Sequence, residues 1–134
     1  MRNERNVKKV LLVEDELDIN LVFKTVLEYS RFEVDAFNDP LLALQNFVTN
    51  SYDLLLLDIV MPKMNGFHLY QMIRKIDAKI KICFITASEM YNEQVRKEVF
   101  PQFADIKDKS CFFIKKPIEN QDLIEQLDKI INPT

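Results

Sequence analysis

The sequence predicts an α/β fold in which one five-stranded parallel sheet carries helices on both faces. Short apolar runs alternate along the chain with segments whose apolar residues recur at helical spacing. The segments between successive strands are roughly ten or more residues long, enough for right-handed crossover helices that keep the strands parallel. The length of 134 residues suits one domain. We therefore expect residues 1–134 to form a single domain, with its core at about 8–131 and no further domain.

The first two strand–helix units are recognised from a change of periodicity. Lys8–Val13 is brief and rich in Val and Leu, which is typical of a buried strand. Asp18 is a possible cap or first-turn acid of the helix that follows. Phe32–Phe37 alternates as a half-buried strand, and Asp39-Pro40 is typical of a helix start because proline is tolerated at the first helical position. The apolar residues at helical spacing in these two helices are Ile19, Val22, Phe23, Val26, Leu27, Leu44, Phe47 and Val48.

The third unit begins with Asp53–Asp58, four leucines between two carboxylates. Leucine is a good helix former, so propensity alone would favour a helix here. The flanking elements and the break at Met61-Pro62 make a buried strand the better interpretation. The helix that follows begins at Gly66 and carries Leu69, Tyr70, Ile73 and Ile76 on one face.

The last two units follow the same alternation. Lys79–Ile85 and Cys111–Ile114 are predicted strands. Residues 88 to about 100 are predicted to form one helix with a thin apolar face of Val95 and Val99, which Pro101 should end or kink near Val99. The closing amphipathic helix carries Leu123, Ile124, Leu127, Ile130 and Ile131.

Composition excludes several functional classes. Gly66 is the only glycine, whereas a Walker loop or a dinucleotide-binding loop needs several. The net charge of −3 argues against direct nucleic-acid binding, which needs a basic face. Cys83 and Cys111 are far apart with no CxxC pairing, as expected of buried thiols in a reducing cytosol. The one histidine, His68, is expected to be exposed. With no signal peptide or apolar span, we expect a cytoplasmic protein that does not use the membrane.

Polar residues stand directly after four of the five predicted strands. In open parallel sheets ligands bind at the carboxyl ends of the strands, near the point where strand order reverses. Three carboxylates, a hydroxyl and an ammonium would therefore converge on one edge of the sheet. The residues at these strand ends are Glu14, Asp15, Asp58, Thr86, Ala87 and Lys116, the last directly before Pro117.

This combination favours phosphoryl chemistry with a metal ion. Clustered carboxylates repel one another, which implies a bound hard cation or raised pKa values. Oxygen ligands suit Mg²⁺ or Mn²⁺, and a lysine and a hydroxyl beside such a cation can hold a phosphoryl group. Asp58, at the end of the most buried strand, is the best nucleophile for an aspartyl phosphate. Taken alone, Glu14 and Asp15 would be a solvated helix-start cluster, Thr86 a helix cap and Lys116 a surface charge.

Four strings contain these residues: 10–16 (VLLVEDE), 57–66 (LDIVMPKMNG), 85–87 (ITA) and 116–117 (KP). Together they resemble a response-regulator receiver domain of the CheY-like single-domain type, the phospho-accepting part of two-component signalling. The resemblance covers the chain apart from short tails. It implies a flavodoxin-like (βα)5 fold and a signalling switch that takes phosphate from a sensor histidine kinase or phosphotransfer protein onto Asp58 and signals to an unknown output protein.

The resemblance also implies roles for single residues. Asp15 would bind Mg²⁺ directly and Glu14 through water, with Asp58 and the backbone carbonyl of Val60 completing the protein ligands. Thr86 and Lys116 would contact the phosphoryl oxygens. Thr86 and Phe113 would form the switch: Thr86 moves inward, Phe113 fills the space, and the face of the fourth helix, fifth strand and fifth helix changes shape. Neighbours of the phosphate loop would be Ala87, Pro117 and Gly66, and the Lys116–Pro117 peptide would be cis.

One region departs from the family pattern. The segment 100–110 before the last strand is longer than usual and lacks glycine. It is either a tolerated surface insertion or an altered output surface, with Phe100, Phe103 and Ile106 exposed as a docking patch or packed on the core.

Three alternatives remain open on sequence alone. An aspartate-nucleophile phosphatase-like hydrolase would use Asp58, but Val60 stands where such enzymes carry a second acid. A flavin-binding flavodoxin relative would need a phosphate loop after the first strand, where Glu14 and Asp15 would repel phosphate. A receiver-like scaffold that is not regulated by phosphate would share the fold and leave the strand-end residues unused.

Overall fold

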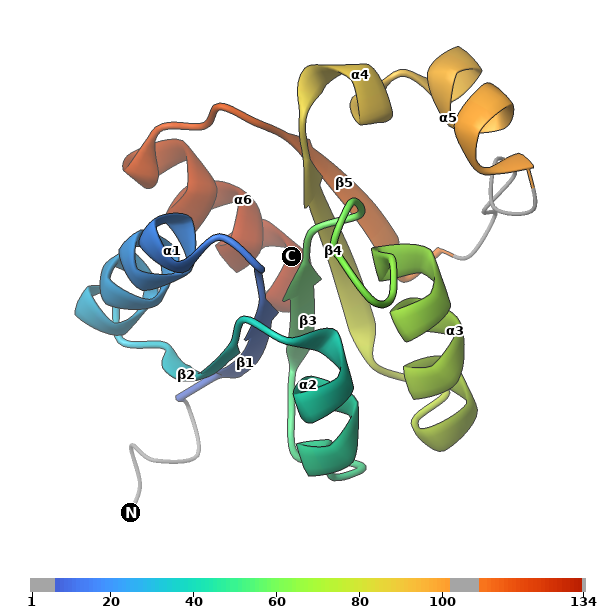
Figure 1. The fold of residues 1–134 in the computed structure, drawn as a ribbon. Coiled ribbons are helices and arrows are strands. Elements are labelled where there is room, and N and C mark those ends of the chain that lie inside the picture. The colour runs from blue at the N-terminus through green and yellow to red at the C-terminus, as the bar shows by residue number, and fades with distance from the viewer. Residues whose placement is uncertain (1–6, 102–108, 134) are drawn as a thin grey trace.

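A single parallel sheet forms the centre of the molecule (Figure 1). The computed structural model describes residues 7–101 and 109–133. Its five strands lie in the order β2-β1-β3-β4-β5, and all neighbouring pairs are parallel, as the sequence predicts. The strands are β1 (Lys9–Val13), β2 (Glu33–Phe37), β3 (Leu54–Leu57), β4 (Lys81–Thr86) and β5 (Cys111–Lys115).

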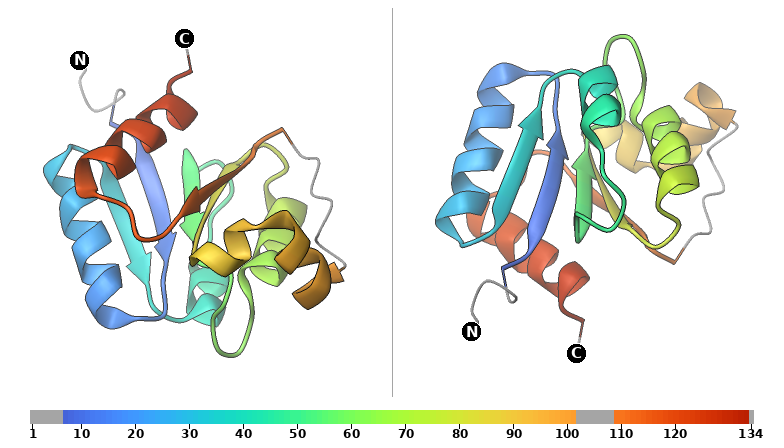
Figure 2. Two further views of the ribbon diagram at one scale, coloured as in Figure 1. Left: turned by 90° about the horizontal axis from the view of Figure 1, so that it is seen from above. Right: turned by 90° about the horizontal axis from the view of Figure 1, so that it is seen from below.

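Helices cover both faces of this sheet (Figure 2). The helices α1 and α6 contact each other on one face, and α2 and α3 contact each other on the opposite face. The bounds are α1 (Leu17–Tyr29), α2 (Pro40–Asn46), α3 (Gly66–Ile76), α4 (Ser88–Tyr91), α5 (Glu93–Val99) and α6 (Asn120–Ile131). This arrangement is the flavodoxin-like (βα)5 fold expected from the sequence, except that the fourth helix is divided into two.

The strands alternate their side chains between two hydrophobic cores, because successive residues of a strand point to opposite faces. Leu11 and Val13 of β1 join the core under α2 and α3, while Val10 and Leu12 join the core under α1 and α6. All four leucines of β3 are fully buried, as expected for a central strand covered on both sides. The helix Leu residues that close the second core are Leu27, Leu123 and Leu127.

The strand register brings the ends of β1 and β3 side by side. Val13 pairs with Leu57, and the backbone N–H of Asp58 donates to the Val13 carbonyl at 3.1 Å. Strand order reverses between these two strands, since β1 connects outward to β2 and β3 leads toward β4. The residues just after β1 and β3 therefore meet at the switch point of the sheet, where ligands bind in such folds.

The prediction of one helix over residues 88–100 was wrong. Asn92 has extended backbone angles (φ −76°, ψ 123°), and its side chain accepts hydrogen bonds from the N–H groups of Gln94 and Val95. An asparagine that caps a new helix in this way interrupts the preceding one. The predicted end near Val99 was correct, because α5 ends there, before Pro101.

The segment before β5 is described only at its two ends. Phe100 is half-buried and packs edge-on against Phe67 of α3, with ring centroids 5.5 Å apart. This residue therefore packs on the core while staying partly exposed, whereas Phe103 and Ile106 lie outside the described residues. Within residues 7–101 and 109–133 the helices are all too short or too polar to cross a membrane.

The two cysteines lie on neighbouring strands, as predicted. Cys83 is fully buried in β4, and burial raises the pKa of its thiol. Cys111 in β5 is half-buried rather than a core residue, because β5 is an edge strand.

Candidate functional site

Three carboxylates gather at the switch point. Glu14, Asp15 and Asp58 each place one carboxylate oxygen within 4.8 Å of the others. Glu14 is fully buried and Asp58 is 7% exposed, while Asp15 is half-buried at the mouth of the group. Buried carboxylates are unfavourable unless hydrogen bonds and opposite charge compensate them.

Lys116 supplies part of that compensation. Its Nζ donates to Glu14 Oε1 at 2.9 Å and to Asp58 Oδ2 at 3.0 Å. The backbone N–H of Lys116 donates to the Thr86 carbonyl at 2.6 Å, which fixes the start of the loop after β5. The following Lys116–Pro117 peptide is cis, as the resemblance implied. Partial burial lowers the pKa of Lys116, but the hydrogen bond to Glu14 and the charge of Asp58 outweigh it and hold the pKa above its ordinary value.

One ammonium does not balance three carboxylates. Burial raises the pKa of Glu14 from its ordinary 4.5 to about 6, against the hydrogen bond from Lys116 that lowers it, and the charge of Asp58 raises it further. A divalent cation would remove this residual repulsion. The donor set consists entirely of carboxylate oxygens, which suits Mg²⁺ or Mn²⁺ and not a soft metal.

The carboxylate of Asp58 has a fixed orientation. Its Oδ1 accepts a hydrogen bond from the N–H of Ile59 at 2.7 Å, and its Oδ2 accepts from Lys116. The helix after this loop is capped by Asn65, whose Oδ1 accepts from the N–H of His68 at 2.9 Å. Strand end, loop and α3 thus form one hydrogen-bonded unit around Asp58.

Gly66 is needed for a close approach of two backbone segments. Its N–H donates to the Ile59 carbonyl at 2.7 Å, and a Cβ at this position would overlap the carbonyl oxygen of Asp58. Its φ angle is not positive, so the steric contact and not a left-handed turn is what excludes other residues. The only glycine in the sequence thereby shapes the loop beside Asp58.

Thr86 is a buried hydroxyl without a hydrogen bond among the described residues. It ends β4 and is fully buried, and its Oγ1 has no partner there. The N-cap position of α4 is Ala87, and no side chain caps this helix. The Thr86 hydroxyl is therefore not a helix cap. An unpaired buried hydroxyl costs about 1–3 kcal/mol, and a ligand oxygen at the edge of the sheet would relieve that cost.

Asn20 is a structural support of the site that sequence reasoning missed. It lies in α1, is 8% exposed, and donates through Nδ2 to the carbonyls of Glu14 and Phe37 at 2.9 Å each. It therefore ties the loop after β1 to the end of β2. Its spacing could have revealed it, because it precedes Phe23 by three residues and Leu27 by seven on the buried stripe.

The remaining predicted residues lie around this group. Val60 has an exposed side chain in the loop after β3, and Ala87 and Pro117 are exposed after β4 and β5. Phe113 is half-buried in β5 and stacks on Phe84 with ring centroids 5.1 Å apart. His68 is exposed on α3, as expected.

An apolar cavity of about 540 Å³ adjoins the site. It lies between α1, the start of α4 and the loop after β5. The charged residues that line it are Asp18, Glu89 and Lys116, and the apolar lining residues are Ile19, Val22, Phe23, Ala87, Pro117 and Ile118.

The family model for the response regulator receiver domain matches residues 10–128, nearly the whole of this architecture. The chain belongs to the response regulator receiver family. Members of this family are signalling switches of two-component systems, and they bind Mg²⁺ in general. The flavin-binding alternative is therefore set aside.

Curated relatives agree with this assignment. A CpxR-homologous transcriptional regulatory protein of Haemophilus influenzae is 30% identical over 125 residues, which are 93% of this chain and 51% of that protein. The response regulator receiver protein CpdR of Brucella abortus is 29% identical over 125 residues, which are 93% of this chain and 98% of that protein. The chain thus spans about half the length of the transcriptional regulators it matches, but nearly all of a receiver protein.

Solved receiver structures share the fold. The non-phosphorylated HemR receiver domain of Leptospira biflexa superposes with a TM-score of 0.76 at 28% identity, over 95% of this chain and 96% of that one. A CheY-like receiver domain of Methanospirillum hungatei gives a TM-score of 0.72 at 25% identity, over 94% of both chains.

Proposed function

We propose that this receiver domain accepts a phosphoryl group on Asp58 from a phosphohistidine of a sensor histidine kinase or phosphotransfer protein, in a reaction that needs Mg²⁺ or Mn²⁺. The observation that carries this proposal is the buried Asp58 carboxylate, held by Lys116 and within 4.8 Å of the Glu14 and Asp15 carboxylate oxygens. A carboxylate oxygen of Asp58 attacks phosphorus, and the P–N bond to the histidine breaks. The imidazole nitrogen leaves with the bonding electron pair and takes up a proton, and an acyl phosphate remains on Asp58.

The cation site is assigned to the side chains of Glu14, Asp15 and Asp58 and to the carbonyl of Val60. The bound cation supplies positive charge that offsets the repulsion between these carboxylates and an incoming phosphoryl group. Lys116, already placed 3.0 Å from Asp58, supplies the fixed positive charge on the other side. The unpaired hydroxyl of Thr86 donates a hydrogen bond to a phosphoryl oxygen, which gives this buried group its partner.

Phosphorylation is then communicated to a partner at the side of the sheet where β5 lies. When Thr86 turns toward the phosphoryl group, Phe113 can move inward on the neighbouring strand. Phe113 pairs with Phe84, which precedes Thr86 by two residues and so lies on the same face of β4. The surface formed by α4, α5, β5 and α6 then changes and selects an output protein.

The phosphodonor protein is proposed to dock over the apolar cavity beside Lys116. Val22 of α1 lines this cavity and is 49% exposed, so the apolar lining is accessible to a partner. A phosphohistidine protein bound there would reach Asp58 from the open edge of the sheet.

Hydrolase activity is not favoured. The position two residues after Asp58 is Val60, whose side chain is 58% exposed and carries no acid. We therefore assign a switch rather than an enzyme, and the following experiment also tests the phosphate-independent scaffold.

Intact-mass measurement after incubation with phosphoramidate and Mg²⁺ tests the proposal. The expected result is one phosphoryl group on the protein, none in Asp58→Asn and none after chelation of the metal. The matched control is Asp53→Asn at the opposite end of β3. The Asp53 carboxylate accepts a hydrogen bond from the backbone N–H of Lys9 at 2.8 Å, far from the acidic group, so this variant should be phosphorylated like wild type. Absence of any adduct, or an adduct that persists in Asp58→Asn, would overturn the proposal.

A further inference from the structure

The helix α5 is attached to the rest of the molecule by unusually little apolar packing. None of its seven residues is buried, and Val99 is 51% exposed. A helix of this length is unstable by itself, so tertiary contacts must hold it in place. Among the described residues, Arg96 supplies several of these contacts.

Arg96 joins three elements at once. Its guanidinium carbon lies 4.3 Å from the centroid of the Phe113 ring in β5. One guanidinium nitrogen donates to the carbonyls of Met90 and Tyr91 at 2.9 and 2.7 Å, the last two residues of α4. Arg96 thus links β5 to both halves of the divided fourth helix.

The ring under Arg96 is the aromatic residue assigned to the switch. The Phe113 ring contacts two groups. It stacks on the Phe84 ring, with centroids 5.1 Å apart and an interplanar angle of 30°, and the Arg96 guanidinium carbon lies 4.3 Å from its centroid. Inward movement of Phe113 would break its contact with Arg96. The Arg96 Nε is buried and has no hydrogen-bond partner among the described residues, so the planar stacking and the two carbonyl contacts are what hold this side chain.

We propose that Arg96 is a clamp that holds Phe113 and the α4–α5 junction in the arrangement of the unphosphorylated protein. This inference rests on the proposed phosphorylation of Asp58. In it, Arg96 is a positioning residue that disfavours the arrangement adopted by the phosphorylated protein. A two-state switch responds to such a residue through its populations, because a contact made in only one state shifts the equilibrium toward that state. Lysine cannot replace arginine here, since it lacks the planar fork that stacks on a ring and contacts two carbonyls.

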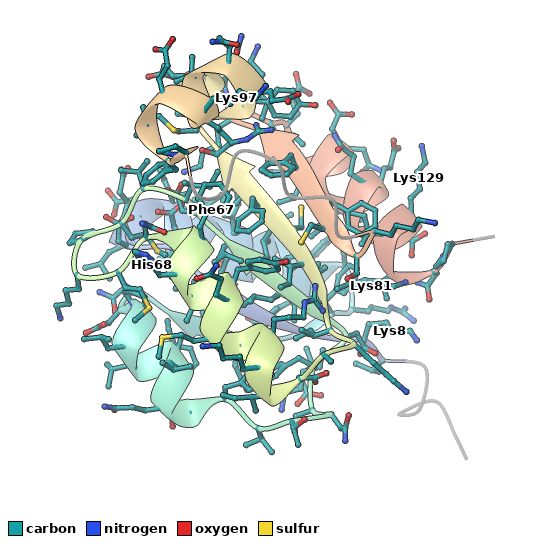
Figure 3. All side chains as sticks on the ribbon, turned by 90° about the vertical axis from the view of Figure 1, so that its right-hand side faces the viewer. Lys8, Phe67, His68, Lys81, Lys97 and Lys129 are labelled. Carbon is teal, nitrogen blue, oxygen red and sulfur yellow. The ribbon has the colours of Figure 1, made fainter. Side chains whose placement is uncertain are left out.

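The matched variants are Arg96→Ala, Arg96→Lys and Lys97→Ala. Lys97 lies next to Arg96 on the outer side of α5 (Figure 3), where its ammonium is 3.7 Å from Glu93 and about half exposed. Loss of the clamp should raise the initial rate of phosphorylation by phosphoramidate at saturating Mg²⁺ by about three- to tenfold, in both Arg96 variants. Lys97→Ala should react at the wild-type rate. A purely structural role would leave the rate unchanged or lower it, so Arg96 variants no faster than Lys97→Ala would overturn the proposal.

Hydrogen exchange of the unphosphorylated protein gives an independent test. Backbone amides of residues 88–99 should exchange at least about threefold faster in Arg96→Ala than in wild type and in Lys97→Ala, while those of β1 and β3 stay unchanged. Unchanged exchange in residues 88–99 would overturn the clamp. If wild type itself takes no phosphoryl group, the proposed function fails, and the exchange result still decides whether Arg96 holds this junction.

Discussion

The acidic edge and the α4–α5 segment are held in place in different ways. At the acidic edge, Asp58 follows four fully buried leucines, and α3 behind it buries Gly66, Phe67, Leu69 and Ile73. In the α4–α5 segment, α5 buries no residue and depends on Asn92 and Arg96. The part proposed to carry the chemistry is therefore anchored in both cores, whereas the part proposed to move is attached by a few polar contacts. Such weakly held elements are the ones that can change conformation at low cost.

Removal of Lys116 should have the largest effect on stability. Lys116→Met leaves the Glu14 and Asp58 carboxylates without their hydrogen-bonded cation, and we expect a loss of about 3 kcal/mol in the free energy of unfolding without metal. Lys97→Met, which removes an exposed ion pair in α5, should change it by less than about 0.5 kcal/mol. Urea unfolding measures both. Equal effects would contradict the contrast between the two regions.

Gly66→Ala should be the next most harmful change. The new methyl group would overlap the Asp58 carbonyl oxygen, a rigid backbone atom, so the loop must shift at a cost of about 2 kcal/mol. The displaced Asp58 should also weaken Mg²⁺ binding, which isothermal titration calorimetry would detect. Wild-type stability together with wild-type metal affinity in Gly66→Ala would show that this loop is less tightly constrained than the structure indicates.

The contribution of Glu14 to the stability of the metal-free protein should fall as the pH rises from about 4.5 to about 6. Burial raises the pKa of Glu14 to about 6 in the folded state, above the ordinary 4.5 of the unfolded chain, so the folded state binds this proton more tightly. The contribution is fully present below pH 4.5 and lost above 6, and amounts to at most about 2 kcal/mol. The measurement is the difference in unfolding free energy between wild type and Glu14→Gln across this range. A difference that does not vary with pH would contradict the assigned cause.

Mg²⁺ should alter this pH dependence, because a proton and the cation compete for the same carboxylates. The apparent Mg²⁺ affinity of wild type is expected to fall as the pH drops through about 6, the pKa of Glu14. Glu14→Gln removes this titrating carboxyl group, so the Mg²⁺ affinity of that variant should vary less with pH.

Removal of two asparagine caps, one in each region, should have the smallest effects on stability. Asn65 caps α3 through the N–H of His68, and Asn92 caps α5 through the N–H groups of Gln94 and Val95. Asn65→Ala should lower the global free energy of unfolding by about 1 kcal/mol, because α3 belongs to the core. Asn92→Ala should leave the global value nearly unchanged and instead speed hydrogen exchange within residues 93–99. Equal global losses would show that α5 unfolds together with the core.

The sequence predicted the sheet and the strand-end cluster because both depend on local patterns. For the four leucines between carboxylates, the alternation of the flanking elements outweighed helix propensity and indicated a buried strand. Parallel strands then bring Glu14, Asp15 and Asp58 to one edge. The break at Asn92 was missed although Asn92 is a good cap residue. The apolar face recognised in this stretch, Val95 and Val99, lies wholly after Asn92 and so gave no information about where the helix began. The same cap signal was recognised at Asp39, where the adjacent Pro40 strengthened it; there Asp39 accepts from the N–H of Leu41.

Contacts between distant segments could not be predicted in this way. The stacking of Arg96 on Phe113 depends on how the divided fourth helix lies against β5, and no spacing in the sequence encodes that placement. The burial of Asn20 had a visible signal, but its two carbonyl partners, Glu14 and Phe37, come from different strand ends.

Borohydride trapping of the phosphorylated protein tests the central claim most directly. Borohydride reduces an acyl phosphate to an alcohol, so a phosphorylated aspartate becomes homoserine, which peptide mass spectrometry can locate. After incubation with phosphoramidate and Mg²⁺, the account predicts homoserine at position 58 and unmodified aspartate at positions 15 and 53. Homoserine at another carboxylate, or none in protein that has gained a phosphoryl group by intact mass, would contradict it.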